Sequence, residues 1–107
     1  MATFHVSLIT PEAVTFQGDV DHVRVPAHEG YLGLLAGHAA TLTSLTQGAV
    51  TIQTGPDKSF YAIGSGILEV SGSEVLIMAD NVEAAESDDD AKEKASALAK
   101  SLEADPS

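Results

Sequence analysis

Four histidines, His5, His22, His28 and His38, are the residues of this 107-residue chain that are chemically best suited to bind a metal ion. Imidazole is a common metal ligand, and the chain has no cysteine to supply thiolates or disulfides. The histidines are spaced neither as a pair on one helical face nor as the short pair of a zinc finger. We therefore expect no metal site and interpret them as surface or hydrogen-bonded loop residues.

The sequence gives little support for acid–base or nucleophilic chemistry. Asp19 and Asp21 lie beside His22, but carboxylates two residues apart on a strand share one face and are usually solvated. Ser65 stands between two glycines without the second spacer of a Gly-x-Ser-x-Gly nucleophile elbow, and no glycine run leads into the Gly-Lys-Ser/Thr of a phosphate loop. We therefore expect no catalytic residue, no nucleotide-binding residue and no cofactor.

Residues 29–40, EGYLGLLAGHAA, form the most unusual stretch of the chain. Tyr31 and three leucines stand among three glycines, whose backbones reach dihedral angles that other residues avoid. Such a segment is either a buried turn and strand or a loop whose apolar side chains are exposed for docking. Composition alone leaves both readings open.

The elements that position these residues are predicted to be β-strands, because apolar residues alternate over residues 3–79 and successive strand side chains point to opposite faces. Thr10-Pro11-Glu12 and Gly18-Asp19 are expected as turns. Turns recur about every 8–12 residues without a helical period between them, which is typical of an antiparallel sandwich or flattened barrel. Strands are expected at residues 4–8, 14–16, 23–25, 50–53, 60–63, 67–70 and 75–79.

One stretch fits this alternation poorly. Leu42 and Leu45 are three residues apart, a spacing that suits a helical turn better than a pleated strand. We interpret residues 41–46 as a strand with a bulge.

The composition changes after Ala79, and a single short helix is predicted. Ser87 is a candidate N-cap, and the three aspartates that follow complement the positive end of a helix dipole. Small and apolar residues then recur with helical spacing, and we expect the helix to end before Pro106. Because this stripe is mostly alanine, it should bury little area and attach weakly to the sandwich or to a partner. The stripe comprises Ala91, Ala95, Leu98, Ala99 and Leu102.

These patterns divide the chain into a β-sandwich at residues 1–84 and a short acidic helix and tail at residues 85–107. Sixteen acidic and five basic residues give a net charge of −11, which repels nucleic acid and anionic lipid surfaces. No stretch reaches the ~20 apolar residues that span a bilayer, and the N-terminus lacks the pattern of a signal peptide. We expect a chain that is soluble and does not bind nucleic acid.

Several short motifs follow one another in order along residues 3–83. They are Thr10-Pro11-Glu12, Phe16-x-Gly18, Val23-x-Val25-Pro26, Glu29-Gly30-x-Leu32-Gly33, Gly37-His38-Ala39, Leu42-x-x-Leu45, Gly48, Gly64-x-Gly66-x-x-Glu69-Val70 and Val75-x-Ile77-x-Ala79. In this order and spacing the sequence resembles the epsilon subunit of the rotary F-type ATP synthase, which is called delta in mitochondria. The resemblance implies a mainly β fold, in which a ten-stranded antiparallel β-sandwich (a flattened barrel) precedes the C-terminal helix.

The resemblance also implies a role without catalysis. Such a subunit belongs to the central stalk at the cytoplasmic face of the bacterial inner membrane, where it binds the gamma subunit and the ring of c subunits and couples proton flow to ATP synthesis. Transient contact with the alpha and beta subunits is also implied, and membrane association would occur only through the complex. Carried over by motif, the c-ring contact falls on Glu29, Gly30, Tyr31, Leu32 and Gly33, and the gamma contact on His38 and Thr43.

The C-terminal region departs from the family pattern of two helices that extend along gamma and inhibit ATP hydrolysis. Only one short helix fits here, and residues 90–95, DAKEKA, lack the arginine of the family's ATP-binding motif. We therefore expect intrinsic inhibition to be reduced or absent. Two alternatives stay open: an ATP-responsive inhibitory regulator of the same complex, and a free-standing acidic sandwich that binds a small ligand or a metal.

Overall fold

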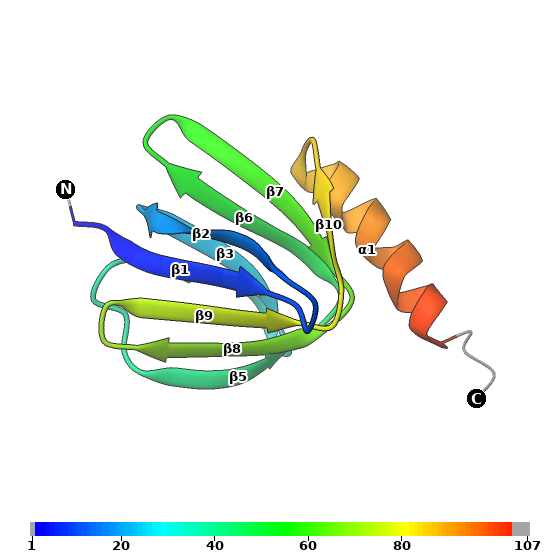
Figure 1. The fold of residues 1–107 in the computed structure, drawn as a ribbon, viewed down its shortest axis with the longest axis horizontal. Helices are drawn as coiled ribbons and strands as arrows, with labels where there is room; N and C mark the ends of the chain where they lie inside the picture. The colour runs from blue at the N-terminus through cyan, green and yellow to red at the C-terminus, as the bar shows by residue number, and fades with distance from the viewer. Residues whose placement is uncertain (1, 104–107) are drawn as a thin grey trace.

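Ten strands and one helix follow one another along the chain in the computed structural model, which describes residues 2–103 (Figure 1). The strands roll into a flattened, barrel-like sandwich, and the helix lies against one end of it, so the predicted fold class is confirmed. The elements are β1 (Phe4–Ile9), β2 (Val14–Val20), β3 (His22–Ala27), β4 (Gly30–Leu34), β5 (Thr41–Leu45), β6 (Gly48–Thr54), β7 (Asp57–Ile63), β8 (Gly66–Ser71), β9 (Glu74–Ala79), β10 (Val82–Ala85) and α1 (Asp88–Glu103).

The strands form one continuous sheet in the order β10-β7-β6-β3-β5-β8-β9-β1-β2, with β4 attached to β3. All neighbours are antiparallel except β1 and β9, which run parallel. This exception needs no crossover helix because the whole chain between the two strands serves as the connection. Across the open side, the rings of Phe16 on β2 and Tyr61 on β7 lie with their centroids 6.4 Å apart. The two ends of the sheet therefore approach each other.

The core lies between the two layers of the sandwich and is built from alternate strand residues. Phe4, Val6 and Leu8 share the inner face of β1, as their spacing predicts, and all three are buried. Ile77, which is fully buried, lies beside them on β9, where it pairs with Leu8, and branched residues of other strands, such as the fully buried Ile52, complete the core. No polar or charged side chain is buried among the described residues. The sandwich is therefore held together by apolar packing and by the backbone hydrogen bonds of the sheet.

Two local predictions are wrong. Gly18-Asp19 is not a turn: both residues lie within β2, where Gly18 pairs with Val6 and Asp19 pairs with His5. The residues 41–46 stretch contains no bulge, because β5 pairs with β8 in unbroken register from Thr41↔Val70 to Leu45↔Gly66. The leucine spacing arises because Leu45 faces the core while Leu42 points outward and is 72% exposed.

The helix begins where the sequence predicts. The Asp90 N–H donates to Ser87 Oγ at 3.0 Å, and the Glu86 N–H donates to Asp90 Oδ2 at 3.0 Å, so the first turn is capped from both directions. The Ala91 and Ala95 side chains of α1 are fully buried against β6 and β7, so the helix attaches to the sandwich. The predicted stripe also includes Leu102, whose side chain lies outside the described residues, as does the tail beyond Glu103.

Candidate functional site

The β3–β4 hairpin carries the residues predicted to contact the c-ring. Its two strands pair from Val23↔Leu34 to Ala27↔Gly30, so Glu29 lies in the turn and Gly30 begins β4. Alternation along β4 then places Leu32 and Leu34 toward the core and Tyr31 on the opposite face. Glu29 and Gly30 are exposed at the tip of the hairpin, where another protein can reach them.

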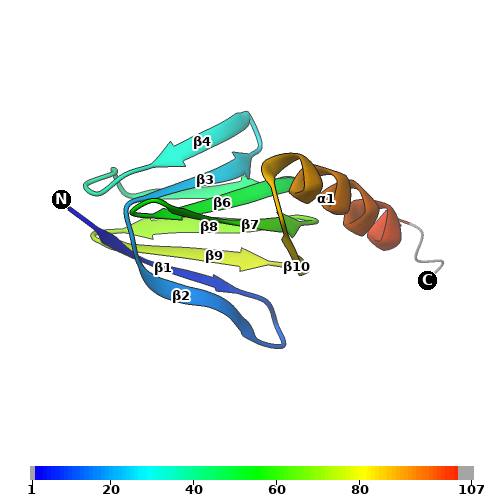
Figure 2. The ribbon, with the colours of Figure 1, turned by 90° about the horizontal axis from the view of Figure 1, so that it is seen from above.

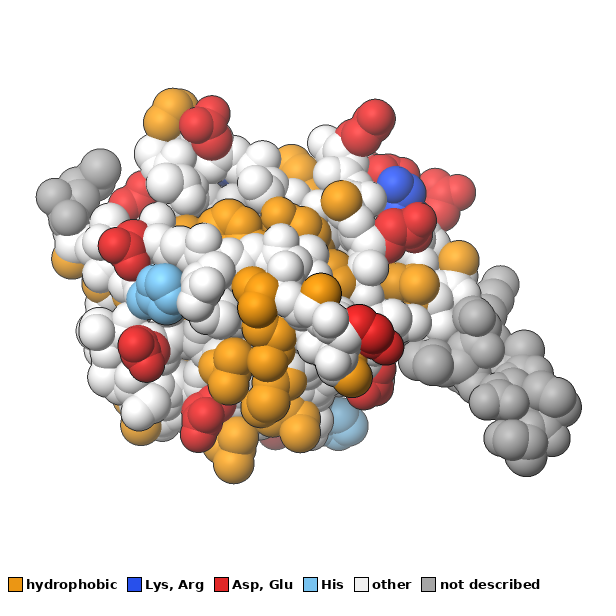
Figure 3. Space-filling model, viewed as in Figure 1, with side chains coloured by type: hydrophobic (Ala, Val, Ile, Leu, Met, Phe, Trp, Pro, Cys, Tyr) orange, Lys and Arg blue, Asp and Glu red, His pale blue; other side chains and the backbone are white. Residues whose placement is uncertain are grey.

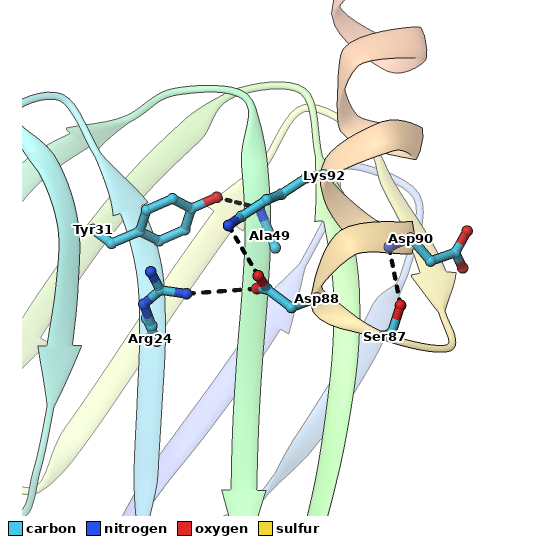
Figure 4. A network of polar contacts seen from close by, with 7 residues as sticks. All are labelled: Arg24, Tyr31, Ala49, Ser87, Asp88, Asp90 and Lys92. Atoms are coloured by element: carbon cyan, nitrogen blue, oxygen red, sulfur yellow. Dashed lines mark hydrogen bonds and ion pairs between the residues drawn. The ribbon is translucent and has the colours of Figure 1, made fainter.

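Tyr31 lies beside the start of α1, one residue after the tip residue Gly30 (Figure 4). Its hydroxyl oxygen accepts a hydrogen bond from the Ala49 N–H on β6 at 3.1 Å. The Arg24 guanidinium lies 4.0 Å from the centroid of the ring, and Lys92 Nζ of α1 lies 5.2 Å from it. Tyr31 as a whole is 38% exposed. The structure therefore separates the predicted c-ring residues, because Tyr31 is held by contacts within the subunit whereas Glu29 and Gly30 are exposed.

A glycine makes room for this placement of Tyr31. A Cβ added at Gly48 would lie 2.6 Å from the Pro26 Cβ and 2.8 Å from the Tyr31 hydroxyl oxygen. Real Cβ atoms do not approach other heavy atoms so closely, so a side chain at position 48 would displace both neighbours. Gly48 is one of the motif residues found in the sequence. The close approach of Pro26 and Tyr31 explains why a glycine is needed there.

Charges around Tyr31 form a small network. Asp88 of α1 contacts Lys92 Nζ at 2.9 Å and Arg24 Nη1 at 3.5 Å. The hydrogen bond from Lys92 to Asp88, together with their charge attraction, raises the pKa of Lys92 above its ordinary value of 10.5. Sequence reasoning missed this network. The spacing of four between Asp88 and Lys92 is readable on a helix, but no sequence signal connects Asp88 to Arg24, 64 residues earlier.

The two residues predicted to contact gamma lie in different settings. His38 is in the loop after β4, where its Nδ1 donates to the Ala39 carbonyl oxygen at 2.8 Å. Thr43 is half-buried in the middle of β5 and pairs with Leu68. Thr43 lines a groove of about 540 Å³ whose other wall includes Glu29, Gly30 and Tyr31. The structure therefore brings Thr43 close to the hairpin residues.

An apolar strip crosses the outer face of β5, β8 and β9. Leu42, Ile67 and Met78 are 72%, 45% and 37% exposed, and Ile67 pairs directly with Met78. Figure 3 shows hydrophobic side chains gathered over these strands. Ile67 and Met78 also line a groove of about 550 Å³ that extends to Ile9 and Pro11. Exposed apolar side chains gathered in this way usually mark a protein interface.

The described residues hold no group of three or more histidine, cysteine, aspartate or glutamate side chains arranged to bind a metal ion. The histidines are dispersed: His5 contacts Asp19, and His22 Nε2 would lie 3.1 Å from a Cβ added at Gly33. Ser65 donates a hydrogen bond to Asp80, a residue in the loop after β9. No helix in the part of the chain that the structure describes is both long enough and apolar enough to cross a membrane.

The architecture is that of a β-sandwich with a docked C-terminal helix, which offers exposed surfaces for protein contact. Residues 3–85 match the family described as ATP synthase, Delta/Epsilon chain, beta-sandwich domain. The chain therefore belongs to the delta/epsilon chain family of ATP synthase, as its motifs indicate.

Relatives of known name agree with this assignment. Over 80 residues the chain is 45% identical to "ATP synthase epsilon chain 1" of Nitrobacter hamburgensis and 42% identical to the ATP synthase epsilon chain of Rhodopseudomonas palustris strain TIE-1. These 80 residues are 75% of this chain and 59% of each relative. The aligned part is thus less than two thirds of either relative's length.

Solved structures share the fold. A chain of the Euglena gracilis mitochondrial ATP synthase, in a structure titled OSCP/F1/c-ring, matches with a TM-score of 0.75 at 24% identity, covering all of this chain and 69% of that chain. A chain of the Tetrahymena thermophila mitochondrial ATP synthase, in a structure titled central stalk/c-ring, matches with a TM-score of 0.66 at 17% identity, covering 74% of this chain and 64% of that chain. The β-sandwich of this chain therefore has a fold that occurs in solved structures.

Proposed function

We propose that this chain is a non-catalytic rotor subunit of the F1 central stalk, which links the gamma subunit to the c-ring and couples proton translocation to ATP synthesis. The carrying observation is the family match over residues 3–85 on a barrel-like sandwich that exposes a hairpin tip and an apolar strip. A part that transmits torque must be stiff and must be held at two places. Its localisation follows: it lies peripherally at the cytoplasmic face of the bacterial inner membrane and reaches the membrane through its partners.

The hairpin tip is the proposed c-ring contact. Glu29 and Gly30 are the exposed residues at the end of this surface. Leu32 and Gly33 follow them on β4, and Tyr31 lies on the side that faces α1. Glu29 presents an exposed carboxylate that can pair with polar or basic side chains of a c-subunit loop. The contact is therefore small and polar and relies on the hairpin keeping its shape.

Substitution of one carboxylate tests this contact. We expect Glu29→Gln, in enzyme reassembled on membranes, to lower ATP-driven proton pumping more than it lowers ATP hydrolysis, because the link to the ring is weakened. Glu83→Gln on β10 is the matched control, since it removes another exposed carboxylate, on a strand that does not pair with the hairpin. Equal pumping by both variants would contradict the c-ring assignment.

The proposed gamma contact combines His38 and Thr43 with the apolar strip of Leu42, Ile67 and Met78. The strip and Thr43 lie on the same three-stranded part of the sheet, and burial of its exposed side chains would supply the free energy of binding. A permanent interface of this kind has an apolar centre and a polar rim.

A pull-down with gamma measures this second contact. We expect Ile67→Asp to weaken the binding of gamma at least tenfold, because a charge would be buried without a partner. Val14→Asp is the control, since Val14 is also exposed, to 59%, and does not line the groove beside Met78. Unchanged retention of gamma by the Ile67 variant would refute the placement of gamma on this strip.

Reduced or absent inhibition of ATP hydrolysis is part of the proposal. The described helix is docked along β6, β7 and β10 and held by the Arg24–Asp88 ion pair and by the hydrogen bond from Lys94 to the Ala84 carbonyl oxygen, so a brake that depended on its release would first have to break these contacts. We expect removal of residues 86–107 to leave the membrane ATPase rate unchanged. Strong activation would contradict the proposal and favour the inhibitory alternative, and ATP binding measured by calorimetry would favour an ATP-responsive form of it.

A further inference from the structure

Two parts of the chain that are far apart in the sequence, the β3–β4 hairpin and the start of α1, meet at Tyr31. The ring comes from β4, the Arg24 guanidinium from β3, and Asp88 and Lys92 from the first turns of α1 (Figure 4). Figure 2 shows the same proximity, with the β3–β4 hairpin running beside the start of α1. The helix and the hairpin are therefore joined by side chains as well as by their separate attachment to the sheet.

Asp88 is the centre of this junction. Its carboxylate contacts both cations, Lys92 at 2.9 Å and Arg24 at 3.5 Å, and both cations lie over the Tyr31 ring. Cations near an aromatic face attract it, but two cations on one ring repel each other unless an anion lies between them. Asp88 supplies that anion, and it belongs to the helix.

The hydroxyl group of Tyr31 is bonded to the sheet. The Ala49 N–H on β6 donates to the Tyr31 hydroxyl, and Gly48 leaves the space that this approach requires. Tyr31 is thus held by its hydroxyl from β6 and by its face from β3 and α1.

We propose that α1 is a brace for the β3–β4 hairpin, in which Asp88 acts through Arg24 and Lys92 to hold Tyr31 and thereby positions the hairpin tip. Tyr31 and Asp88 are positioning residues in this arrangement, and the tip residues Glu29 and Gly30 make the contact with the partner. A hydrogen-exchange test of this proposal is independent of the proposed c-ring contact. Only a test in the assembled enzyme rests on that contact.

Hydrogen exchange in the isolated full chain provides the first test. The Ala49 amide is the reporter, because its proton is bonded to the Tyr31 hydroxyl and lies far from position 88 in the sequence. We expect Asp88→Asn to accelerate exchange at Ala49 and across β4 by roughly fivefold, the size expected for an exposed ion pair combined with a cation–π contact. Asp88→Glu, which keeps the charge, should restore slow exchange.

A matched control separates the brace from helix capping. Asp90 also lies in the first turn and pairs with the lysine four residues later, Lys94 Nζ being 3.3 Å from Asp90 Oδ2, but among the described residues it contacts neither Tyr31 nor Arg24. Asp90→Asn should therefore accelerate exchange in α1 without affecting Ala49. If Asp88→Asn and Asp90→Asn both changed only the helix amides, the brace would be refuted.

The second test uses the assembled enzyme. Asp88→Asn should weaken retention of the subunit on c-ring membranes, and Tyr31→Phe, which keeps the ring but removes the bond to Ala49, should weaken it less. Normal retention of Asp88→Asn alongside faster exchange at Ala49 would overturn the positioning role. Normal retention of Glu29→Gln would instead refute the c-ring contact, and the exchange result would then still decide whether the brace exists.

Discussion

The interior of the sandwich and the seam beneath α1 exclude water by different means. The interior interlocks branched and aromatic side chains from every layer, and residues such as Leu8, Ile63 and Ile77 are fully buried. The seam instead joins two alanines of the sheet, Ala49 and Ala62, to Ala91 and Ala95 of the helix. Large side chains bury much area and lock the interior, whereas small ones let the helix approach closely but contribute little free energy each.

The seam compensates for its small side chains with polar contacts at its rim. Asp88 connects to Arg24 and Lys92, and Lys94 donates to the Ala84 carbonyl oxygen at 3.0 Å. Such exposed ion pairs add little stability but are directional. We therefore attribute most of the stability of the fold to the interior of the sandwich, and the orientation of α1 to the polar contacts at the rim of the seam. Substitutions should separate these two contributions.

The largest loss of stability is expected inside the sandwich. Ile77→Ala should lower the free energy of unfolding by about 2–5 kcal/mol, because it leaves a cavity among side chains that cannot collapse around it. Urea denaturation measures this. Ile67→Ala, on the neighbouring strand but 45% exposed, should cost about 1 kcal/mol or less. Similar losses for both isoleucines would show that the interior does not dominate.

A smaller loss is expected where two backbones of the sandwich approach each other. A Cβ at Gly66 would clash with the Met78 carbonyl oxygen and lie 3.0 Å from the Ala79 Cα. Gly66→Ala should therefore cost about 1–3 kcal/mol in urea denaturation. Gly18→Ala is the control, since its Cβ would meet only the Phe16 ring at 3.7 Å, an ordinary contact. Equal stability of the two variants would mean that β8 and β9 shift apart without cost.

Overpacking the seam should affect the helix and spare the sheet. Ala95→Leu introduces a side chain that does not fit between α1 and the sheet, and we expect a loss of about 1–2 kcal/mol together with faster amide exchange in α1. The sheet amides should keep their protection. Ala97→Leu, on the exposed face of the same helix, should leave both unchanged. Loss of sheet protection in the Ala95 variant would show that the seam and interior unfold as one unit.

These differences also explain what the sequence predicts well. Alternation identifies the inner face of β1, and Ser87 with its three aspartates identifies the start of α1, because both signals are local. The Gly18-Asp19 prediction is wrong because glycine in a strand and glycine in a turn look alike without knowledge of the pairing partner, here Val6.

The parts of the site that escape sequence reasoning depend on long-range pairing. Nothing in residues 29–33 shows that Tyr31 faces the helix while Glu29 faces outward, because this follows from the register of β4 on β3 and from where α1 docks. The alanine stripe predicts weak attachment from its small area, but not that Ala49 and Ala62 form a matching surface. Complementarity of two surfaces is not visible in either sequence segment alone.

The smallest expected effect is a pH dependence confined to the rim of the seam. Asp88 raises the pKa of Lys92 in the folded chain above its ordinary value of 10.5, so the ammonium stabilises the docked helix fully below that value. The stabilisation is lost as the pH rises through the raised pKa, because the neutral amine no longer pairs with Asp88. We therefore expect amide exchange in α1, corrected for its intrinsic pH dependence, to accelerate across this alkaline window, with little change inside the sandwich.

Two variants assign that alkaline step to Lys92. Both are compared in a Tyr31→Phe background, which removes the phenol from the junction. Lys92→Met keeps the aliphatic length without the charge and should abolish the step while leaving the interior unchanged. Lys58→Met, which removes an exposed lysine of β7 far from the junction, should leave it in place. A step that survived in the Lys92 variant would belong to general alkaline unfolding, and the rim would then have no orienting role of its own.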